Sequence, residues 1–467
     1  MPDTIKNVPR TSFRLLFGIG FSDALKADNY DSDNIVVGRT ATEIVPSAVY
    51  LGKLAEFEQM RRNVWLDCHG AHAIYVVGKR RSGKSYTLGV LCEGLVADSW
   101  LRSGAPDQAV LLLDTLNIYG TLHVQADSGG NQKLWQMPSH ASKVRYLAPE
   151  ATRSKIAAES LRLTIDPSWL TLEDWCGFFD VDPFADPLGH LLAVVLDAAK
   201  QHWQVHQGES NRPKSGIEDL LDALDRRPDA QHFEQSTREA LRRRLLALDR
   251  FDFFKRPSPS VEDLLTPGVV TVCQLRDLDD RVRALVVAVI VREIMRSRAR
   301  SDAHSRLAIA RRHMGTRTEE ETSSTKNLPR CWIAIDEAHN YLPSSGTLPS
   351  RPVLRRLITE GRNIGLSVIV ATQQPSGLDS SIQRNADTLL IHSMSMRDDI
   401  SAAEGMLNTQ VPDSASWGMS EKTSGRVFEK IVRALPQGYC LVSTDTANRI
   451  FGLCVRPRLT LHGGETY

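Results

Sequence analysis

A short glycine-containing segment carries the clearest chemistry in this sequence. Residues 78–85 read Gly-Lys-Arg-Arg-Ser-Gly-Lys-Ser and fit the pattern G-x-x-x-x-G-K-[ST], which is typical of loops that bind nucleotide phosphates. Gly78 and Gly83 permit backbone angles that a side chain would oppose, so successive N–H groups can turn towards phosphate oxygens. Lys84 would contact the β- and γ-phosphates, and the Ser85 hydroxyl would bind Mg²⁺. The predicted ATP-binding residues are Gly78, Ser82, Gly83, Lys84, Ser85 and Tyr86.

The segments on both sides of this loop support the prediction. Residues 73–77 form an apolar run that indicates a buried strand, and residues 86–91 read as the start of a helix. A helix that begins near Lys84 points the positive end of its dipole at the same anion. A chance match in an ordinary turn is the alternative, and the flanking strand and helix argue against it.

A second apolar run ends in two acids. Residues 331–337 read Cys-Trp-Ile-Ala-Ile-Asp-Glu, and downstream of a phosphate loop this pattern indicates the Walker B strand. Asp336 would bind Mg²⁺, directly or through water, and Glu337 would polarise the attacking water. The alternative is a solvated strand end, because strands that end in Asp-Glu are common on their own.

A third apolar run, residues 366–372, is followed by two amides. Gln373 is the first choice for a group that contacts the γ-phosphate or the attacking water, and Gln374 is the second. The amide could instead cap the turn before Pro375. ATPases that form rings often stabilise phosphate charge with an arginine from a neighbouring subunit. The nearby candidates for such a finger, which could equally be solvated surface residues, are Arg355, Arg356, Arg362 and Arg384.

Composition limits the kinds of protein in which these motifs can lie. The chain has 467 residues, 42% hydrophobic and 24% charged, with a formal net charge of +1, so any nucleic-acid contact must come from a local basic patch. The seven cysteines form no C-x-x-C pair and are expected to be buried free thiols. The longest apolar run, residues 284–291, is too short to span a bilayer, and the N-terminus does not resemble a signal peptide. We therefore expect a cytoplasmic protein without a membrane contact.

Continuous apolar runs at residues 109–113 and 268–275 add two further strands, typical of a mainly parallel sheet in an α/β fold. Apolar residues at helical spacing among charged ones predict a helical insertion. The expected divisions are an N-terminal β-rich segment (1–70), the first part of the core (71–150), the insertion (151–265), the second part of the core (266–445, with a flexible connector at 299–330) and a C-terminal arm (446–467).

Several segments together resemble the HerA branch of the HerA/FtsK ATPases. They are residues 114–119, residues 335–340 (Ile-Asp-Glu-Ala-His-Asn), residues 358–366 (Ile-Thr-Glu-Gly-Arg-Asn-Ile-Gly-Leu), residues 371–376 and the tail 455–464. The resemblance covers roughly residues 70–465. It implies a RecA-like core and a hexameric ring with ATP sites between subunits, working as a DNA translocase or helicase. It also implies that Arg362 is the finger that acts in trans, and it supports Gln373 as the sensor.

Two departures from the family pattern stand out. Residues 79–81, Lys-Arg-Arg, replace the small residues that usually fill the phosphate loop. The N-terminal barrel typical of the family is not evident in residues 1–70, where it is either reduced or diverged. His339 and the other histidines show no metal-ligand spacing, so they are interpreted as structural or solvent-facing.

Three functions remain open at this stage. The first is a motor that threads DNA, with Lys133 and Trp135 as candidate pore groups or, alternatively, as parts of an exposed surface loop. The second is a ring scaffold that assembles a separate effector, a nuclease or an NADase, in DNA processing or antiviral defence. The third, a switch without translocation, is disfavoured because Glu337, Gln373 and Arg362 supply a complete set for hydrolysis. The arginines expected to form only a solvated helix face are Arg238, Arg242, Arg243 and Arg244.

Overall fold

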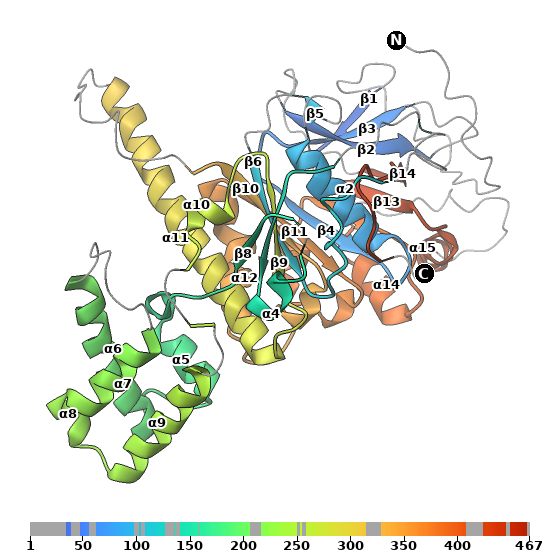
Figure 1. The fold of residues 1–467 in the computed structure, drawn as a ribbon. Helices are drawn as coiled ribbons and strands as arrows, with labels where there is room; N and C mark the ends of the chain where they lie inside the picture. Colours follow the sequence, from blue (N-terminus) through green and yellow to red (C-terminus); the bar gives the residue numbers. More distant parts are fainter. Residues whose placement is uncertain are drawn as a thin grey trace.

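One large sheet organises the computed structural model (Figure 1). The structure describes residues 34–38, 47–55, 62–97, 102–103, 108–126, 135, 141–156, 158–205, 216–249, 253–254, 258–313, 328–407, 424–444 and 449–464. Within these ranges the sheet has fourteen strands. In spatial order they are β1 (Asn34–Val37), β3 (Asn63–Asp67), β2 (Ala48–Leu54), β14 (Arg449–Val455), β13 (Tyr439–Thr444), β12 (Thr388–Ile391), β4 (Ala73–Val77), β11 (Leu366–Thr372), β10 (Arg330–Ile335), β6 (Gln108–Asp114), β9 (Val270–Gln274), β7 (Val144–Ala148) and β8 (Ser160–Arg162), with β5 (Arg102–Ser103) beside β2.

From β12 to β8 every neighbouring pair of strands is parallel. The central strands carry unbroken apolar runs because both of their faces are buried. In β6 the side chains alternate, so Leu111 and Leu113 belong to the core on one face and Val110 and Leu112 to the core on the other. The predicted mainly parallel α/β core is therefore confirmed.

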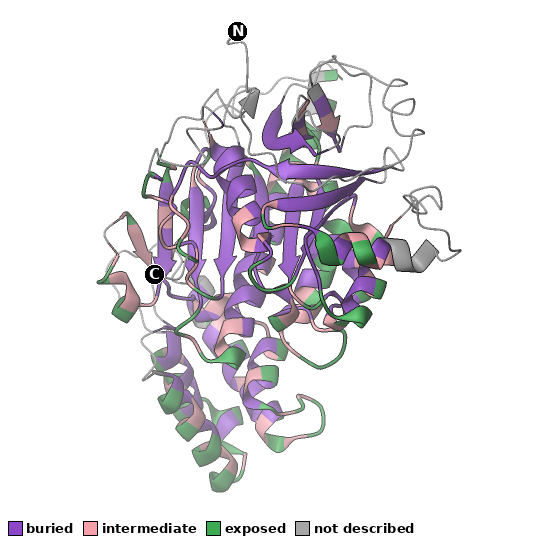
Figure 2. Cartoon of the chain, turned by 90° about the vertical axis from the view of Figure 1, so that its right-hand side faces the viewer, coloured by how far each residue is buried: buried purple, intermediate pink, exposed green. Residues whose placement is uncertain are grey.

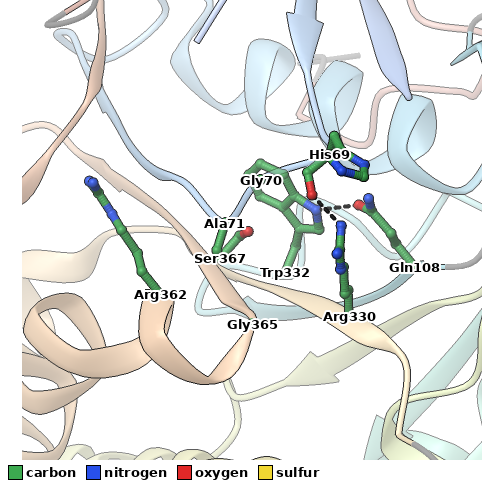
Figure 3. A pocket seen from close by; sticks show the side chains of 9 residues that line it. All are labelled: His69, Gly70, Ala71, Gln108, Arg330, Trp332, Arg362, Gly365 and Ser367. Carbon is green, nitrogen blue, oxygen red and sulfur yellow. Dashed lines mark hydrogen bonds between the residues drawn. The ribbon is translucent and has the colours of Figure 1, made fainter. Parts of the chain in front are cut away.

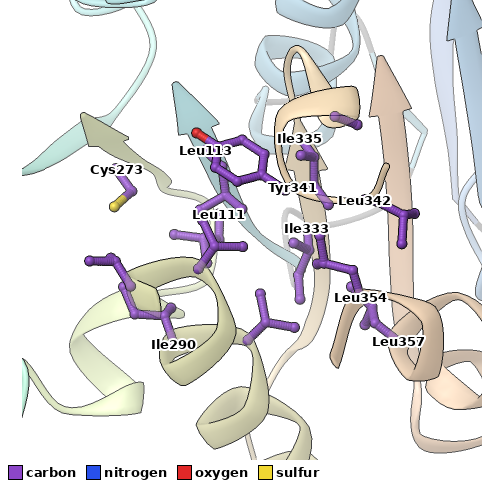
Figure 4. Packing of buried hydrophobic residues seen from close by; sticks show 14 of the residues in the cluster. Leu111, Leu113, Cys273, Ile290, Ile333, Ile335, Tyr341, Leu342, Leu354 and Leu357 are labelled. Atoms are coloured by element: carbon purple, nitrogen blue, oxygen red, sulfur yellow. The ribbon is translucent and has the colours of Figure 1, made fainter. Parts of the chain in front are cut away.

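Helices cover both faces of this parallel region. Helix α2 (Lys84–Val96) packs on one face, and α11 (Asp280–His313) and α12 (Ser350–Glu360) pack on the other, where Ile290 and Leu354 meet the side chains of β6 and β10 (Figures 1 and 4). The remaining helices are α4 (Glu150–Arg153), α5 (Leu172–Phe179), α6 (Pro187–Val205), α7 (Gly216–Arg226), α8 (Pro228–Gln231), α9 (Gln235–Asp249), α10 (Val261–Leu264), α13 (Ser380–Asn385), α14 (Arg397–Glu404) and α15 (Ser424–Ala434), with short 3₁₀ turns η1 (Pro167–Trp169), η3 (Ala338–Asn340), η4 (Gly361–Ile364) and η5 (Pro375–Gly377).

Helices α5 to α9 form a group at one end of the molecule, away from the strands of the sheet (Figure 1). All of them fall within the segment where the sequence predicts a helical insertion. On α9, Arg242 pairs with Asp225 of α7, and Arg243 is exposed. These arginines therefore lie on a solvated and partly ion-paired helix surface.

The two ends of the chain extend the same sheet. Strand β2 pairs antiparallel with β14, which pairs antiparallel with β13, so N-terminal and C-terminal segments lie side by side (Figure 1). The described part of the N-terminal segment is therefore continuous with the core sheet. Strand β14 belongs to the same sheet, although it lies in the segment 446–467 that the sequence assigns to a C-terminal arm. The described strands of the sheet are mostly buried (Figure 2).

Two further expectations are corrected. Helix α11 continues to His313, so residues 299–313 are helical and are not a connector; residues 314–327 lie outside the described residues. Trp135 is only 8% exposed and belongs to the hydrophobic core, with the Lys53 ammonium 5.8 Å from its ring centroid. A buried indole that already contacts a cation cannot face a nucleic acid in a pore, and Lys133 lies outside the described residues.

Candidate active site

The glycine loop joins the carboxyl end of β4 to the first turn of α2, as the sequence predicts. Gly83 has a φ of +106°, a conformation that side chains rarely adopt. A Cβ atom on Gly78 would lie 2.5 Å from the Ser82 hydroxyl and 2.6 Å from the His392 Cβ. Both glycines are therefore required by the loop itself. Lys79, Arg80 and Arg81 are exposed, so the three basic side chains that distinguish this loop point away from its packed side.

The acids that follow β10 lie beside this loop, with β11 between β4 and β10 in the sheet. The Lys84 ammonium is 2.7 Å from Asp336 Oδ1 and 2.9 Å from Glu337 Oε1. Lys84 is 3% exposed, and Asp336 is completely buried. Burial opposes the charge of Lys84, but the two carboxylates outweigh that effect and raise its pKa above the usual value. The two halves of the predicted site are thus in direct contact.

The groups around Asp336 are suited to a Mg²⁺ ion. Its Oδ2 atom accepts a hydrogen bond from Tyr119 at 3.0 Å and lies 3.3 Å from the Ser85 hydroxyl. Mg²⁺ prefers oxygen ligands and is usually held by one or two carboxylates or hydroxyls together with phosphates and water. Within the described residues, no cluster of three or more His, Cys, Asp or Glu side chains forms a separate metal cage. Ser85 and Asp336 are therefore the residues that would hold the ion.

Asp114, at the end of β6, stabilises the turn beside Asp336. Its carboxylate accepts hydrogen bonds from the backbone N–H groups of Leu116, Ile118 and Tyr119, which shape the turn that carries the Tyr119 ring. Burial, with Asp336 nearby, raises the pKa of Asp114 to about 7. The acidic turn seen in the sequence thus acts indirectly, by placing Tyr119 against Asp336.

Glu337 is held in an unusual backbone conformation, with a φ of +50°. Such a conformation in a non-glycine residue persists only where its surroundings impose it. Gln373 at the end of β11 donates a hydrogen bond to Glu337 Oε1, whereas Gln374 is exposed. Of the two amides, Gln373 is therefore the one that lies in the site.

His339 is the first of two histidines that the sequence interpretation missed. Its Nδ1 atom lies 3.0 Å from the Thr372 hydroxyl and 3.6 Å from Glu337 Oε2. Burial, with a smaller contribution from the charge of Lys84, lowers the pKa of His339 below the usual value. The absence of metal-ligand spacing led to an interpretation as structural or solvent-facing, which overlooked a contact made through the turn after β10.

His392 is the second. It is fully buried under the phosphate loop, with Nε2 3.0 Å from the Thr87 hydroxyl and Nδ1 3.0 Å from the Tyr439 carbonyl. A carbonyl only accepts, so Nδ1 carries the proton and Nε2 accepts from Thr87. Burial lowers the pKa of His392 to about 4. Nothing in its local sequence signals this role, which depends on the pairing of β12 with β4.

Tyr86 faces the C-terminal segment. Its hydroxyl accepts the N–H of Arg458 at 2.7 Å, and the same segment is anchored by Glu93 of α2, which pairs with the buried Arg456. Glu93 also accepts the backbone N–H groups of Leu459 and Thr460. The Tyr86 hydroxyl is engaged with the tail, and the contact between Tyr86 and a nucleotide stays a prediction.

Arg362 lies far from this cluster, at the opposite edge of the sheet. It belongs to η4, just before β11, whereas the acids follow β10 at its other end. Its guanidinium is 3.1 Å from Asp387 Oδ2 and donates to the Asn385 carbonyl. It lines a cavity of about 150 Å³ together with Arg330, Trp332 and Gln108 (Figure 3). Arg356 pairs with Glu360, Arg384 bonds Ser380, and Arg355 is exposed.

The comparisons with known proteins agree with this architecture. The family described as Helicase HerA, central domain, matches residues 51–294. The VirB4 structure of Thermoanaerobacter pseudethanolicus superposes with a TM-score of 0.52 at 13% identity, over 92% of this chain and 98% of that one. The bacterial conjugative coupling protein TrwB gives a TM-score of 0.46 at 13% identity, over 85% and 87%. At such identities the likeness to VirB4 shows the fold alone, and it agrees with the RecA-like core. No curated protein sequence matches the chain. No helix of the described residues has the length and apolar character to cross a membrane.

Proposed function

The chain belongs to the family of the HerA helicase central domain, and on that premise we propose that it is a P-loop ATPase that hydrolyses ATP as a hexameric DNA translocase. The single observation that carries the ATPase proposal is the contact of Lys84 with Asp336 and Glu337 at the end of the glycine loop. It joins a phosphate-binding lysine, a carboxylate suited to Mg²⁺ and a candidate general base within one buried cluster.

The cluster suggests how binding leads to hydrolysis. Lys84 is paired with two carboxylates, so it must exchange them for phosphate oxygens when ATP enters. That exchange frees Asp336 for the metal ion and leaves Glu337 held by Gln373, with His339 beside it. Glu337 is then in position to orient the attacking water and to take its proton. Bound Mg²⁺ would neutralise charge on the phosphates, with Ser85 and Asp336 as its protein ligands.

Arg362 supports the ring. The six residues of β10 rise about 20 Å, so a group before β11 cannot reach the phosphates bound by its own chain. In a ring the subunits pack head to tail, and one surface of each meets a different surface of the next. We infer that Arg362 completes the neighbour's site as an arginine finger.

DNA translocation rests on the family, and a second function has specific support. Burial of Trp135 removes the aromatic candidate for a DNA contact, and the net charge of +1 gives no general attraction to DNA. The second candidate is a ring that binds ATP in order to assemble and regulate a separate effector, a nuclease or an NADase, in DNA processing or antiviral defence. A separate partner protein is part of the proposal under both functions.

The deciding experiment is ATP hydrolysis by the purified protein with and without double-stranded DNA, at low and moderate salt. The control is Lys84→Ala, which removes the phosphate-binding ammonium. A motor should show turnover that DNA stimulates, that salt weakens and that the variant lacks. Turnover that is indifferent to DNA would favour the scaffold instead. Equal turnover in Lys84→Ala and the unaltered protein would contradict the ATPase site itself.

A further inference from the structure

Apart from Arg362, the residues that line the cavity at the amino edge of the sheet have no role in the site described above. The cavity lies where β4, β6, β10 and β11 begin, between the segment that leads into β4 and the turn η4 (Figure 3). Arg330 and Arg362 stand on either side of the segment that carries Gly70 and Ala71. With about 150 Å³ the cavity is too small for a nucleotide, since sites for such ligands hold roughly 300–1,000 Å³.

The inner wall of the cavity is neutral and already hydrogen-bonded. The Trp332 indole donates to Gln108 Oε1 at 2.5 Å, and Gln108 in turn donates to the Cys68 carbonyl at 2.7 Å. Trp332 is 1% exposed and Gln108 is 2% exposed. This wall is therefore preformed, and the charge of the cavity comes from its rim.

The rim is cationic. Arg362 is paired with Asp387, whereas Arg330 donates to the His69 carbonyl and has no carboxylate partner in the described part of the chain. Arg298 of α11 reaches the same turn, where it donates to the carbonyls of Ile364 and Leu328. Burial above all, and the charge of Arg330 in addition, lower the pKa of Arg298. Three guanidinium groups thus gather at one edge, where Asp387 pairs with Arg362 and the charge of Asp302 acts on Arg298.

Guanidinium groups at a small preformed cavity fit an anion with several oxygen atoms. Arginine presents donors in a planar fork that matches phosphate, and charge-assisted bonds of this kind are the strong ones. Within the described part of the chain, the guanidinium of Arg330 bonds the His69 carbonyl and keeps further donors for an anion. The chemistry of the cavity therefore fits one phosphoryl group and not a whole nucleotide.

We propose that Arg330 is a second arginine that acts in trans, binding with Arg362 the terminal phosphate of ATP held by the neighbouring subunit. This inference rests on the proposed ring. It adds Arg330 and the cavity to the groups that would contact the neighbour's ATP. Arg362 follows α12 and Arg330 begins β10, so the two come from different elements and approach the phosphate from two sides. The pair would supply two positive charges to a site whose own chain provides Lys84.

The test compares purified Arg330→Ala with Arg330→Lys and with Arg355→Ala, an exposed arginine of α12 that does not line the cavity. Loss of the charge-assisted bonds should lower kcat about 10- to 100-fold with little change in KM. Lysine should restore only part of the rate, because it lacks the fork, and Arg355→Ala should be unchanged. Ring assembly, measured by light scattering, should be the same in all three. An unchanged kcat in Arg330→Ala would overturn the proposal.

Mixing subunits tests whether Arg330 acts in trans. Arg330→Ala keeps an intact glycine loop, and Lys84→Ala keeps an intact amino edge, so equal mixing should recreate about one complete interface in four. Turnover should then exceed that of either variant alone. The parallel mixture of Arg362→Ala with Lys84→Ala separates the two proposals. If only the Arg362 mixture recovers, the ring stands and Arg330 has no role in trans. If neither recovers, the sites between subunits are wrong altogether.

A phosphate of nucleic acid is the competing occupant, and it predicts a different result. In that case Arg330→Ala would hydrolyse ATP normally without DNA and would lose only affinity for double-stranded DNA, with a smaller salt dependence. That outcome would overturn the assignment to the neighbour's ATP.

Discussion

The carboxyl and amino edges of the parallel sheet are built in opposite ways. At the carboxyl edge Lys84, Asp336 and Glu337 satisfy one another within a buried cluster. At the amino edge Arg330 has an exposed guanidinium that meets a carbonyl and no described carboxylate. One edge is closed by its own side chains, and the other exposes a guanidinium group at its rim. The difference indicates that nucleotide binding must open the first edge, whereas the second is ready for an anion.

Strand direction explains why both edges belong to one function. All strands from β12 to β8 run the same way, so the turns that follow them gather at one edge and the turns that precede them gather at the other. Ligands of open α/β sheets bind outside the carboxyl ends of the strands. In the proposed ring the amino edge contributes to the site of a different copy, which makes rescue between subunits the sharpest test of the comparison.

The largest expected effect is that of Glu337→Gln at the carboxyl edge. Removal of the general base should lower ATP turnover by about 10²- to 10⁴-fold. ATP binding should persist or tighten, because Lys84 loses one of the carboxylates that compete with the phosphates for it. Turnover and equilibrium ATP binding measured on the same preparation check both parts.

Two controls test whether this effect arises at the carboxyl edge of the sheet. Glu360→Gln removes an exposed carboxylate of α12 that pairs only with Arg356 in the described chain, and it should leave turnover unchanged. Glu337→Gln mixed with Lys84→Ala should not recover, since both changes damage the same edge. Recovery in that mixture, or normal turnover in Glu337→Gln, would contradict the assignment of ATP hydrolysis to the carboxyl edge.

The elements that could be predicted from the sequence are those whose signal is local. The glycine loop, the strand before it and the acids after β10 each lie within a few residues, and their apolar runs reflect burial on both faces. Gln373 was found because it ends the strand that lies between β4 and β10. Each of these predictions needed only the rule that parallel strands bring their carboxyl ends together.

The features that were missed depend on contacts between distant segments. His392 and Thr87 are 305 positions apart, and Tyr119 and Asp336 are 217 apart, so no local pattern relates them. Trp135 was misjudged because its polar neighbours suggested exposure, while its ring packs into the core. The C-terminal boundary of α11 was misplaced because its last turns carry charged side chains exposed to solvent, which resemble a connector in sequence.

The next effect concerns His392, which is buried under the glycine loop. Burial lowers the pKa of His392 from 6.5 to about 4, so the unfolded chain binds a proton between these values and the folded chain does not. Stability from this group is therefore full above pH 6.5 and is lost as the pH falls towards 4. A pKa difference of this size corresponds to about 3 kcal/mol.

Urea denaturation of the unaltered protein and of His392→Gln at pH 7 and at pH 4.5 measures this contribution. The variant should lose less of its free energy of unfolding on acidification than the unaltered protein does. His232→Gln, a change at an exposed histidine of the insertion, should keep the original pH dependence. The same loss in all three proteins would mean that acid acts elsewhere in the chain.

The smallest effect tests how the carboxyl edge holds its metal ion. Tyr119→Phe removes the hydroxyl that donates to Asp336 at 3.0 Å and leaves the ring in place. Loss of a group that orients a metal-binding carboxylate typically lowers metal affinity by about 10- to 100-fold. The Mg²⁺ concentration for half-maximal ATP turnover should therefore rise about tenfold. Tyr146→Phe is the matched control, because its buried hydroxyl bonds the Gly120 carbonyl in the same turn without contacting Asp336. An equal shift in both variants would trace the effect to the turn. A shift in Tyr119→Phe alone would place it at the two residues that this hydroxyl contacts, Asp336 and Ser85, where an edge closed by its own side chains must open to bind the ion.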